Sequence, residues 1–308
     1  MGKGKTMRTA PQPAPQTSPG APGGLNLPMR HPGPRAEPRV LAVPTGLTPI
    51  DIAFDGTEDL ETAIAAAFDA AGLTSGFIEI EGLVCTQLQY VIPAKFEFSD
   101  RMAWYSAPRP TRGDTTIRSA YVSVGRDKGA GFTHCHGIWD LSDGHCAVGH
   151  LLAPATRPKA GQRIRAYGFL SAVFERCHDP ETNFDLFAAM PRHAPHSGPC
   201  DGPPDAIVAT LRPDQDVATT CAALCRRHGI ESARIIGLGS LNGARFEGAM
   251  TMQDSASEFL VSAGQATPDA ADLSVVVVDS AANVFDGRLA PGQGRVSITS
   301  EIVLLRDA

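Results

Sequence analysis

Apolar residues recur at helical spacing in two segments of the chain, one beginning near residue 57 and the other near residue 214. In the first segment Thr57 is a favourable N-cap, and Gly72 is expected to end the helix. In the second segment Asp214 takes the capping position and Gly229 the terminating position. Each pattern predicts an amphipathic helix with one face packed against another element.

A similar pattern of turn and strand follows each predicted helix. Residues 72–84 and 229–241 match position by position, and residues 132–152 resemble residues 271–290. Runs rich in β-branched and apolar side chains at 120–124, 274–278 and 295–304 predict strands. The sequence therefore predicts an α+β fold of two tandem copies, each a mixed or antiparallel sheet packed with a leading helix.

Proline and glycine content marks the expected boundaries of these copies. Residues 1–49 are rich in Pro, Gly, Ala and Gln, which favours a disordered tail. We expect the first copy over residues 50–191 and the second over 205–308. Residues 192–204, rich in Pro, Gly, Ser and His, are interpreted as a linker.

Composition narrows the classes of function. Of the 308 residues 43% are hydrophobic and 19% are charged, as in ordinary globular proteins, and the net charge of -6 gives no general attraction to nucleic acid. The seven cysteines form no C-x-x-C pair, which favours a reducing compartment. Neither a secretory signal nor an apolar run of about 18 residues is found, so we expect a cytoplasmic protein without a membrane partner.

The segment from residue 133 to 150 contains the clearest chemistry in the chain. On a strand, His134 and His136 share one face because side chains alternate. A three-residue loop ending in a left-handed Gly144 would place His150 opposite His136, on that same face. A slip of one residue in this register would move His150 to the other face.

Three neutral imidazoles with an open fourth position are typical of a catalytic zinc site, and another divalent transition metal is possible at the same ligands. Cys146 lies too far along the strand from His150 to complete a structural site. The alternative is that His134, His136 and His150 are ordinary polar residues of a half-buried strand.

A few other residues are candidates for roles near such a metal. Glu79 and Glu81, on the first predicted strand, are candidate general acids or bases. Arg118 and Arg126 are candidates for binding an anionic substrate, and Trp104 for lining a pocket. A solvated or structural role is the favoured alternative for the four charged residues, and an ordinary core or surface role fits Trp104 at least as well. The chain has no phosphate-binding loop and no dinucleotide fingerprint.

The histidine segment also carries a family resemblance. Both copies resemble the PPC domain, named for plants and prokaryotes, whose hallmark is His-x-His, a glycine-containing turn and Gly-His-Leu. The hallmark is matched at residues 134–136 and 149–151, and Asp-Pro-Glu-Thr at 179–182 resembles the closing segment of bacterial members. The leading helix and the Gly-Ser-Leu strand of the family are matched best at residues 211–241.

This resemblance implies several properties. It implies an α+β domain that assembles as a trimer and, in prokaryotic members, a metal bound by the three histidines. The fold is similar to that of acetolactate decarboxylase and of a zinc-dependent ester hydrolase family. Leu273, Val275 and Arg288 stand at the histidine positions in the second copy, so we expect that copy to bind no metal. A homo-oligomer is expected, as a trimer of two-copy chains resembling a hexamer, or as a smaller assembly.

Three interpretations of the function follow from these observations. The first is a metal-dependent enzyme, a zinc lyase or hydrolase acting on a small carbonyl, carboxylate or ester compound. The alternative is a DNA-associated regulatory protein, although the Arg-Gly-Arg-Pro core of the AT-hooks of plant members is absent. Local support for nucleic acid is limited to a basic run, Arg157, Lys159, Arg163 and Arg165. A structural metal without turnover is a third option.

Overall fold

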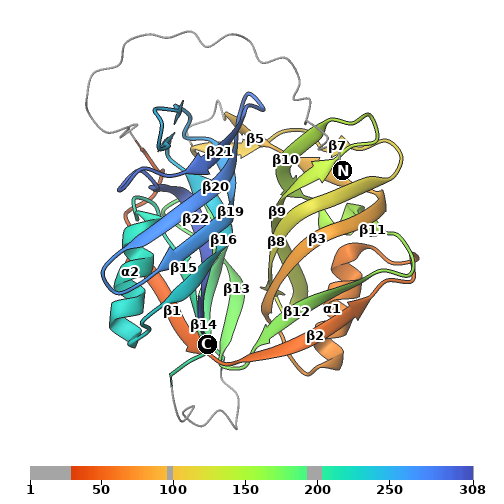
Figure 1. The fold of residues 1–308 in the computed structure, drawn as a ribbon, viewed down its shortest axis with the longest axis horizontal. Coiled ribbons are helices and arrows are strands. Elements are labelled where there is room, and N and C mark those ends of the chain that lie inside the picture. The colour runs from red at the N-terminus through yellow and green to blue at the C-terminus, as the bar shows by residue number, and fades with distance from the viewer. Residues whose placement is uncertain (1–28, 96–99, 193–202, 308) are drawn as a thin grey trace, which may run out of the picture.

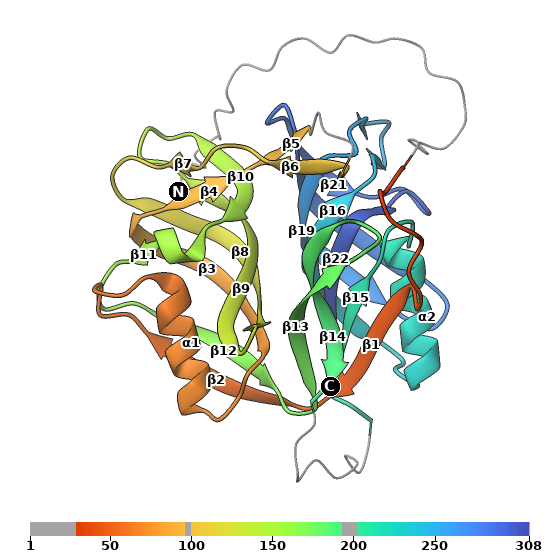
Figure 2. The same cartoon turned by 180° about the vertical axis from the view of Figure 1, so that it is seen from behind.

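Two β-sheets stand face to face, each with one helix on its outer side (Figures 1 and 2). The computed structural model describes residues 29–95, 100–192 and 203–307. Helix α1 (Leu60–Ala70) packs on the sheet of the N-terminal half, and α2 (Val217–His228) on the sheet of the C-terminal half. The molecule is therefore layered as helix, sheet, sheet and helix.

The C-terminal sheet has seven strands, and all neighbouring strands run antiparallel. Their order across the sheet is β1 (Val40–Thr45), β15 (Ala206–Leu211), β22 (Val296–Arg306), β16 (Ala233–Leu241), β19 (Ser257–Ala266), β20 (Ala271–Asp279) and β21 (Val284–Arg288).

The N-terminal sheet has eleven strands. Its main path is β2 (Leu47–Ala53), β12 (Arg163–Phe169), β3 (Gly76–Gln87), β8 (Thr115–Asp127), β9 (Ala130–Asp140), β10 (Cys146–Leu151), β4 (Gln89–Val91) and β7 (Arg109–Pro110). Strand β11 (Arg157–Pro158) pairs with β3, and the hairpin of β13 (Ala172–Asp179) and β14 (Phe184–Pro191) joins β8. Two small sheets pair β5 (Pro93–Lys95) with β6 (Ala103–Tyr105) and β17 (Ala244–Arg245) with β18 (Thr251–Met252), and a short 3₁₀ helix spans Ala153–Ala155.

The two large sheets repeat one strand order. The path β2-β12-β3-β8-β9-β10 matches β15-β22-β16-β19-β20-β21, and in each half a helix follows the first of these strands in sequence. The described chain is thus mostly antiparallel sheet with two α-helices, which agrees with the α+β expectation to that extent. The repeated order supports two copies, while the boundaries at 50–191, 192–204 and 205–308 stay predictions. Residues 193–202 of the expected linker lie outside the described residues.

Regular structure begins earlier than the boundary that we predicted at residue 49. Strand β1 lies within the expected tail, and it pairs with β15 of the C-terminal half, with Val40 opposite Leu211. Pro44 is tolerated because β1 is an edge strand with a single neighbour. Residues 1–28 of the expected tail lie outside the described residues.

Both helices begin later than their predicted caps. Asp59, not Thr57, caps α1 by accepting a 2.9 Å hydrogen bond from the backbone N–H of Thr62. Asp216, not Asp214, caps α2 through the backbone N–H of Thr219. In each case a carboxylate two residues further on can reach the free N–H groups of the first turn.

Three groups of buried apolar side chains hold the layers together. One lies mainly between α1 and the N-terminal sheet, and a second between α2 and the C-terminal sheet. The third lies between the two sheets and includes Phe77, Tyr121, Phe174, Val208 and Val303. No helix of the described chain is long and apolar enough to span a membrane.

Candidate metal centre

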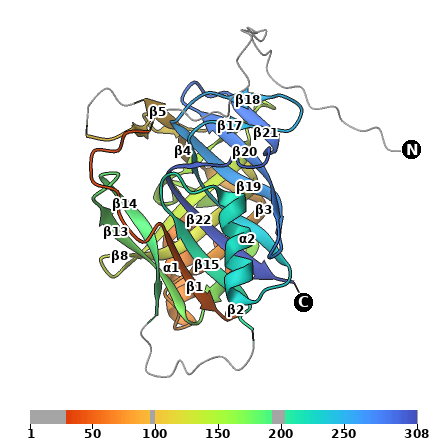
Figure 3. The same cartoon turned by 90° about the vertical axis from the view of Figure 1, so that its left-hand side faces the viewer.

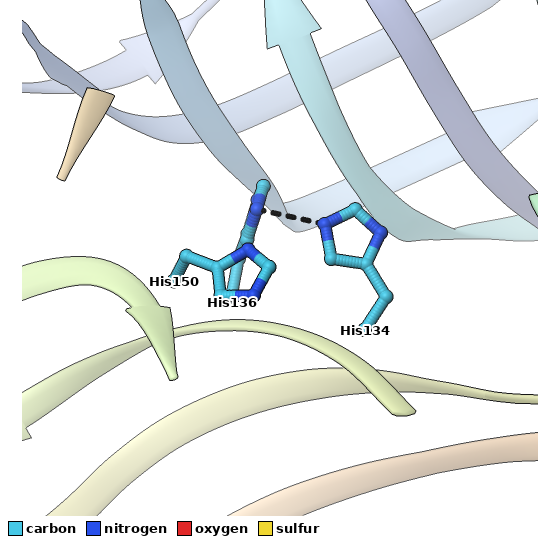
Figure 4. A group of neighbouring side chains, drawn as sticks. All are labelled: His134, His136 and His150. Carbon is cyan, nitrogen blue, oxygen red and sulfur yellow. Dashed lines mark hydrogen bonds between the residues drawn. The ribbon is translucent and has the colours of Figure 1, made fainter. Parts of the chain in front are cut away.

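His134, His136 and His150 converge on the face of the N-terminal sheet that looks toward the other sheet (Figure 4). The pairing of β9 with β10 sets His136 directly opposite His150, in the register that we predicted. The turn closes with Gly144 at φ +84° and a 2.8 Å hydrogen bond from the Leu141 N–H to the His145 carbonyl. Cys135, between the two histidines of β9, points away from them into the core beneath α1.

The glycine before His150 is required by the packing of the neighbouring strand. A Cβ atom at Gly149 would lie 2.4 Å from the carbonyl oxygen of Val91 on β4. Because real Cβ atoms do not approach so closely, a larger residue there would push β4 away from β10, which carries His150. The Gly-His-Leu pattern therefore has a steric basis.

The ring nitrogens of the three histidines are close enough to share one ion. One nitrogen from each ring lies within 4.8 Å of the others, and the Nε2 atoms of His134 and His136 are 3.1 Å apart. Two imidazoles bound tetrahedrally to one zinc at about 2.0–2.1 Å would have their nitrogens about 3.3 Å apart. The spacing of this pair is close to that value.

The C-terminal sheet orients two of these rings. Glu301 on β22 lies 2.9 Å from Nδ1 of His134, and the Phe259 carbonyl on β19 lies 2.8 Å from Nδ1 of His136. A carbonyl oxygen only accepts, so Nδ1 of His136 carries the proton. With Nδ1 of His134 likewise donating to the carboxylate, both Nε2 lone pairs point at each other. Such a pair of facing lone pairs is stabilised when a cation lies between them.

A second glutamate from the C-terminal sheet completes the cluster. Oε1 of Glu258 lies 3.7 Å from Nε2 of His136 and 3.7 Å from Nδ1 of His150. Its other oxygen, Oε2, and Nδ1 of His150 are buried without a hydrogen-bond partner. Burial raises the pKa of the Glu258 carboxyl well above its usual range.

Burial also lowers the pKa of two of the histidines. Burial, and then the neighbouring charge of His134, lowers the pKa of His136 well below its usual range. The same causes, with His136 added, lower the pKa of His150. Neutral imidazoles are the form that binds metal ions. The donor set, the lowered pKa values of His136 and His150 and the unpartnered buried atoms all fit a divalent transition metal, so this cluster could hold one.

A cavity of about 430 Å³ opens beside the histidines between the two halves. Both glutamates and all three histidines line it, together with an aromatic wall from β6 and β14 that includes Trp104, Tyr105 and Phe184. Its volume lies in the range of about 300–1,000 Å³ that is usual for small-molecule sites. The candidate metal centre is therefore reachable by a small ligand.

The structure places the other predicted site residues differently. Trp104 lines the cavity, as expected of a pocket residue. Glu79 forms two 2.7 Å hydrogen bonds with Arg234, and neither it nor the exposed Glu81 lines the cavity. The alternation of β3 that buries Ile78 and Ile80 beneath α1 turns both glutamates to the face that the histidines share, but β8 lies between β3 and β9, so the glutamates stay outside the cavity.

The two predicted substrate arginines have other partners. Arg118 is paired with Asp140 on the adjacent strand, and Arg126 donates to Asp69 of α1 at 2.6 Å. Neither lines the cavity. The structure instead brings Arg101 and Arg176 to the cavity wall.

Sequence reasoning did not single out Glu258 and Glu301. Each is an isolated acid within an apolar strand, and the two are only 5% and 1% exposed. Acidic residues are rarely buried without a functional or structural partner, so their position in such runs was an available signal. Their proximity to His134 and His136 depends on how the sheets pack, which strand patterns do not indicate.

In the second copy, the residues that we aligned with the three histidines do not occupy equivalent positions in the sheet. Leu273 and Val275 face the core beneath α2, whereas His134 and His136 face the other sheet. Arg288 pairs with Ser274 and not with Val275. From β20, Val276 and Val278 point toward the N-terminal half. Inward apolar residues of this kind offer no metal ligand.

Comparison with known proteins identifies similarity to one domain family. Residues 200–306 match the model of the Plants and Prokaryotes Conserved (PCC) domain, the family that the histidine pattern resembles. The matched range is the C-terminal copy, and the three histidines lie outside it. No curated protein matches the chain.

Several solved structures are similar over about half of the chain. A metal-containing protein from Archaeoglobus fulgidus is 16% identical, with 47% of this chain and 94% of that chain covered and a TM-score of 0.35. A plant- and prokaryote-conserved protein from Pyrococcus horikoshii is 16% identical, with 49% and 96% covered and a TM-score of 0.35. A candidate DNA-binding protein from Bacteroides thetaiotaomicron is 16% identical, with 48% and 96% covered and a TM-score of 0.35.

Proposed function

On the premise that residues 200–306 match the model of the PCC domain, we propose that the chain is a metal-dependent protein acting on a small carbonyl, carboxylate or ester compound. His134, His136 and His150 would hold the metal, with zinc as the first candidate and another divalent transition metal as the second. The supporting observation is the convergence of three imidazoles, each with one ring nitrogen close enough to the others to share an ion. Nδ1 of His136 is held by the Phe259 carbonyl, and Nδ1 of His150 is buried without a hydrogen-bond partner. The adjoining cavity would hold the substrate.

Bound there, the metal would supply Lewis-acid polarisation of an oxygen or acidify a water molecule. The residues of the chain would do the rest. Glu301 and the Phe259 carbonyl hold the rings of His134 and His136 in one tautomer. Glu258, a buried carboxyl 3.7 Å from His136 and His150, would take the role of proton acceptor and donor that the sequence suggested for Glu79 and Glu81.

The first test of this proposal is metal content. Protein purified without a His-tag or added metal is analysed by mass spectrometry, as wild type and as the variants His136→Ala and His145→Ala. We expect about one zinc or similar ion per chain in wild type. His136→Ala should lose it, and His145→Ala should keep it because His145 lies exposed in the turn, away from the cluster. Loss of metal in neither variant, or in both, would contradict the assigned ligands.

Turnover is tested separately from metal binding. Metal-loaded protein is screened against small esters and 2-keto acids, and any activity is compared before and after chelation. Activity that disappears on chelation and returns with zinc supports an enzyme. A bound metal without metal-dependent activity would favour the structural role that the sequence left open.

The name of the Bacteroides structure brings a second candidate, association with DNA. In this chain two members of the predicted basic run are neutralised, because Lys159 pairs with Asp114 and Arg165 with Asp51. Fluorescence anisotropy with duplex DNA at 50 and 200 mM salt tests the candidate. Binding through several phosphates would weaken by roughly a thousandfold or more over that range.

Assembly and location complete the proposal. The resemblance to the PPC family supports a homo-oligomer, as a trimer of two-copy chains or a smaller assembly, in the cytoplasm. Light scattering coupled to gel filtration gives the mass of the assembly directly. A monomer at micromolar concentration would exclude the homo-oligomer.

A further inference from the structure

One wall of the cavity extends from the guanidinium group of Arg101 to the three histidines. Arg101, just before β6, has its guanidinium carbon 4.4 Å from the ring centroid of Trp104 and 5.5 Å from that of Phe184. Trp104 lies 5.8 Å from Tyr105, and Tyr105 lies 5.1 Å from His150, measured between ring centroids. A positive charge and the candidate metal centre are therefore joined by an unbroken row of rings.

Of the two arginines that line the cavity, Arg101 is the one less neutralised by nearby carboxylates. Arg176 is held between two carboxylates, Asp127 at 2.7 Å and Asp185 at 3.8 Å. Among the described residues, Arg101 has one weak ion pair, 3.5 Å from Nε to a carboxylate oxygen of Asp100, and its Nε is buried without a hydrogen bond. The side chain of Asp100 is 53% exposed, so water screens that pair. The guanidinium can thus accept an anionic group from a ligand.

The opposite end of the cavity disfavours an anion without a metal. Glu258 and Glu301 are both buried beside the histidines. A ligand carboxylate placed there would meet the like charge of the Glu301 carboxylate in a region of low dielectric. A ligand with one negative charge would place it at Arg101 and place a neutral oxygen toward the histidines.

We infer that the cavity binds a planar aromatic carboxylate, with its carboxylate on Arg101, its ring along Trp104 and Tyr105, and its far end toward His134, His136 and His150. Arginine stacked on aromatic rings keeps its fork of N–H groups available for a bidentate carboxylate. Aromatic side chains in a row favour a flat, unsaturated body over a saturated one. The inference narrows the substrate class of the proposed function. It depends on that function only for the statement that the far end of the ligand meets a metal.

Benzoate is the probe, with benzamide as its neutral isostere and cyclohexanecarboxylate as its saturated analogue. The chain has two tryptophans, and Trp139 is fully buried, so quenching of the more exposed Trp104 reports ligand in the cavity. Full-length wild type is titrated with each compound, and Arg101→Gln is titrated with benzoate and benzamide. Arg112→Gln, at an exposed arginine outside the cavity, is the matched control.

We expect wild type and Arg112→Gln to bind benzoate alike. Arg101→Gln should bind it roughly tenfold more weakly or worse, as for loss of a charged hydrogen bond. Wild type should also prefer benzoate to benzamide by a similar factor and to cyclohexanecarboxylate by a smaller one. Equal affinity for benzoate and benzamide on wild type would overturn the inference without reference to any variant, as would full affinity in Arg101→Gln.

Metal content of the same samples separates this inference from the proposed function. Zinc present in wild type and in Arg101→Gln, with benzoate binding unaffected by the substitution, overturns the aromatic carboxylate and leaves the metal site standing. Arg101-dependent benzoate binding by a chain that holds no metal has the opposite meaning. In that case the ligand class stands and the metal-dependent function fails.

Discussion

The buried carboxylate of Glu301, on the other sheet, lies 2.9 Å from Nδ1 of His134 and orients that imidazole. Replacing Glu301 by Gln preserves the shape of the side chain and removes the negative charge that makes His134 a stronger metal ligand. We expect metal affinity to fall by about 10–100-fold, the usual effect of losing such a partner. Competition with a chromogenic chelator measures this, with Glu231→Gln, an exposed acid, as control. Unchanged affinity would mean that Glu301 does not orient the ligand.

The buried carboxyl of Glu258 should make the stability of the metal-free protein depend on pH. Because its folded-state pKa is raised, the folded chain holds a proton that the unfolded chain releases above about pH 4.5. Its contribution to stability is therefore present below that pH and is lost as pH rises toward the folded-state pKa. Glu258→Gln removes this loss, so its urea midpoint should rise relative to wild type between pH 5 and pH 8. A constant difference between the two midpoints would contradict the assigned pKa direction.

The histidines could be predicted from local sequence, whereas their partners could not. A strand alternates faces and a three-residue loop sets the register, so His134, His136 and His150 follow from residues 134–150 alone. Glu301 lies 167 positions from His134 in sequence. Its place depends on two sheets packing face to face, and no local pattern of residues encodes that contact. Glu79 and Glu81 share the histidines' face but were misplaced for a related reason, because a local pattern does not give the order of strands across a sheet, and β8 separates β3 from β9.

At the scale of the element, the candidate metal centre depends on the packing of the β9–β10 hairpin as much as on the histidines that it carries. Gly149→Ala should force β4 away from β10, since the new Cβ would lie 2.4 Å from the Val91 carbonyl. We expect a loss of about 1–3 kcal/mol in the free energy of unfolding, as for other overpacked sites. Urea denaturation measures it, and Cys146→Ala on the exposed start of the same strand is the control. Equal stability of the two variants would show that β4 relaxes freely.

The helices illustrate how far element boundaries could be predicted. Apolar spacing indicated both helices, and Gly229 ends α2 in the left-handed conformation at φ +65°. The caps were assigned two residues early because Thr57 and Asp214 satisfy the same rule as Asp59 and Asp216. Which of two suitable residues caps a helix depends on where the tertiary packing begins the first turn.

At the scale of the whole molecule, a buried ion pair fastens the N-terminal segment to both halves. Nη1 of Arg39 lies 2.5 Å from Glu181, and Nη2 donates to the Pro213 carbonyl. Burial alone would raise the pKa of Glu181, but hydrogen bonds from Arg39 and the Ala36 N–H lower it. This carboxylate therefore stabilises the fold above about pH 4.5, and the contribution is lost as pH falls below that value.

Arg39→Met should be strongly destabilising at neutral pH because it leaves Glu181 buried without its cation. We expect a loss of about 3–5 kcal/mol, the usual effect of breaking one side of a buried pair. The double variant Arg39→Met, Glu181→Met should recover much of it, which denaturation at pH 7 can measure. A single variant as stable as wild type would contradict this role of the pair.

Strand β1 gives the molecule an order of assembly that differs from its order of synthesis. Its residues leave the ribosome well before those of β15 (Ala206–Leu211), its one sheet neighbour within the described residues. At about 5–20 residues per second the strand waits roughly 10–30 s for that neighbour. During this interval the nascent chain displays an unpaired apolar segment beside an N-terminal sheet that can already form. The C-terminal sheet thus captures a strand that is translated ahead of the N-terminal sheet, and a released N-terminal fragment would be a natural target for chaperones.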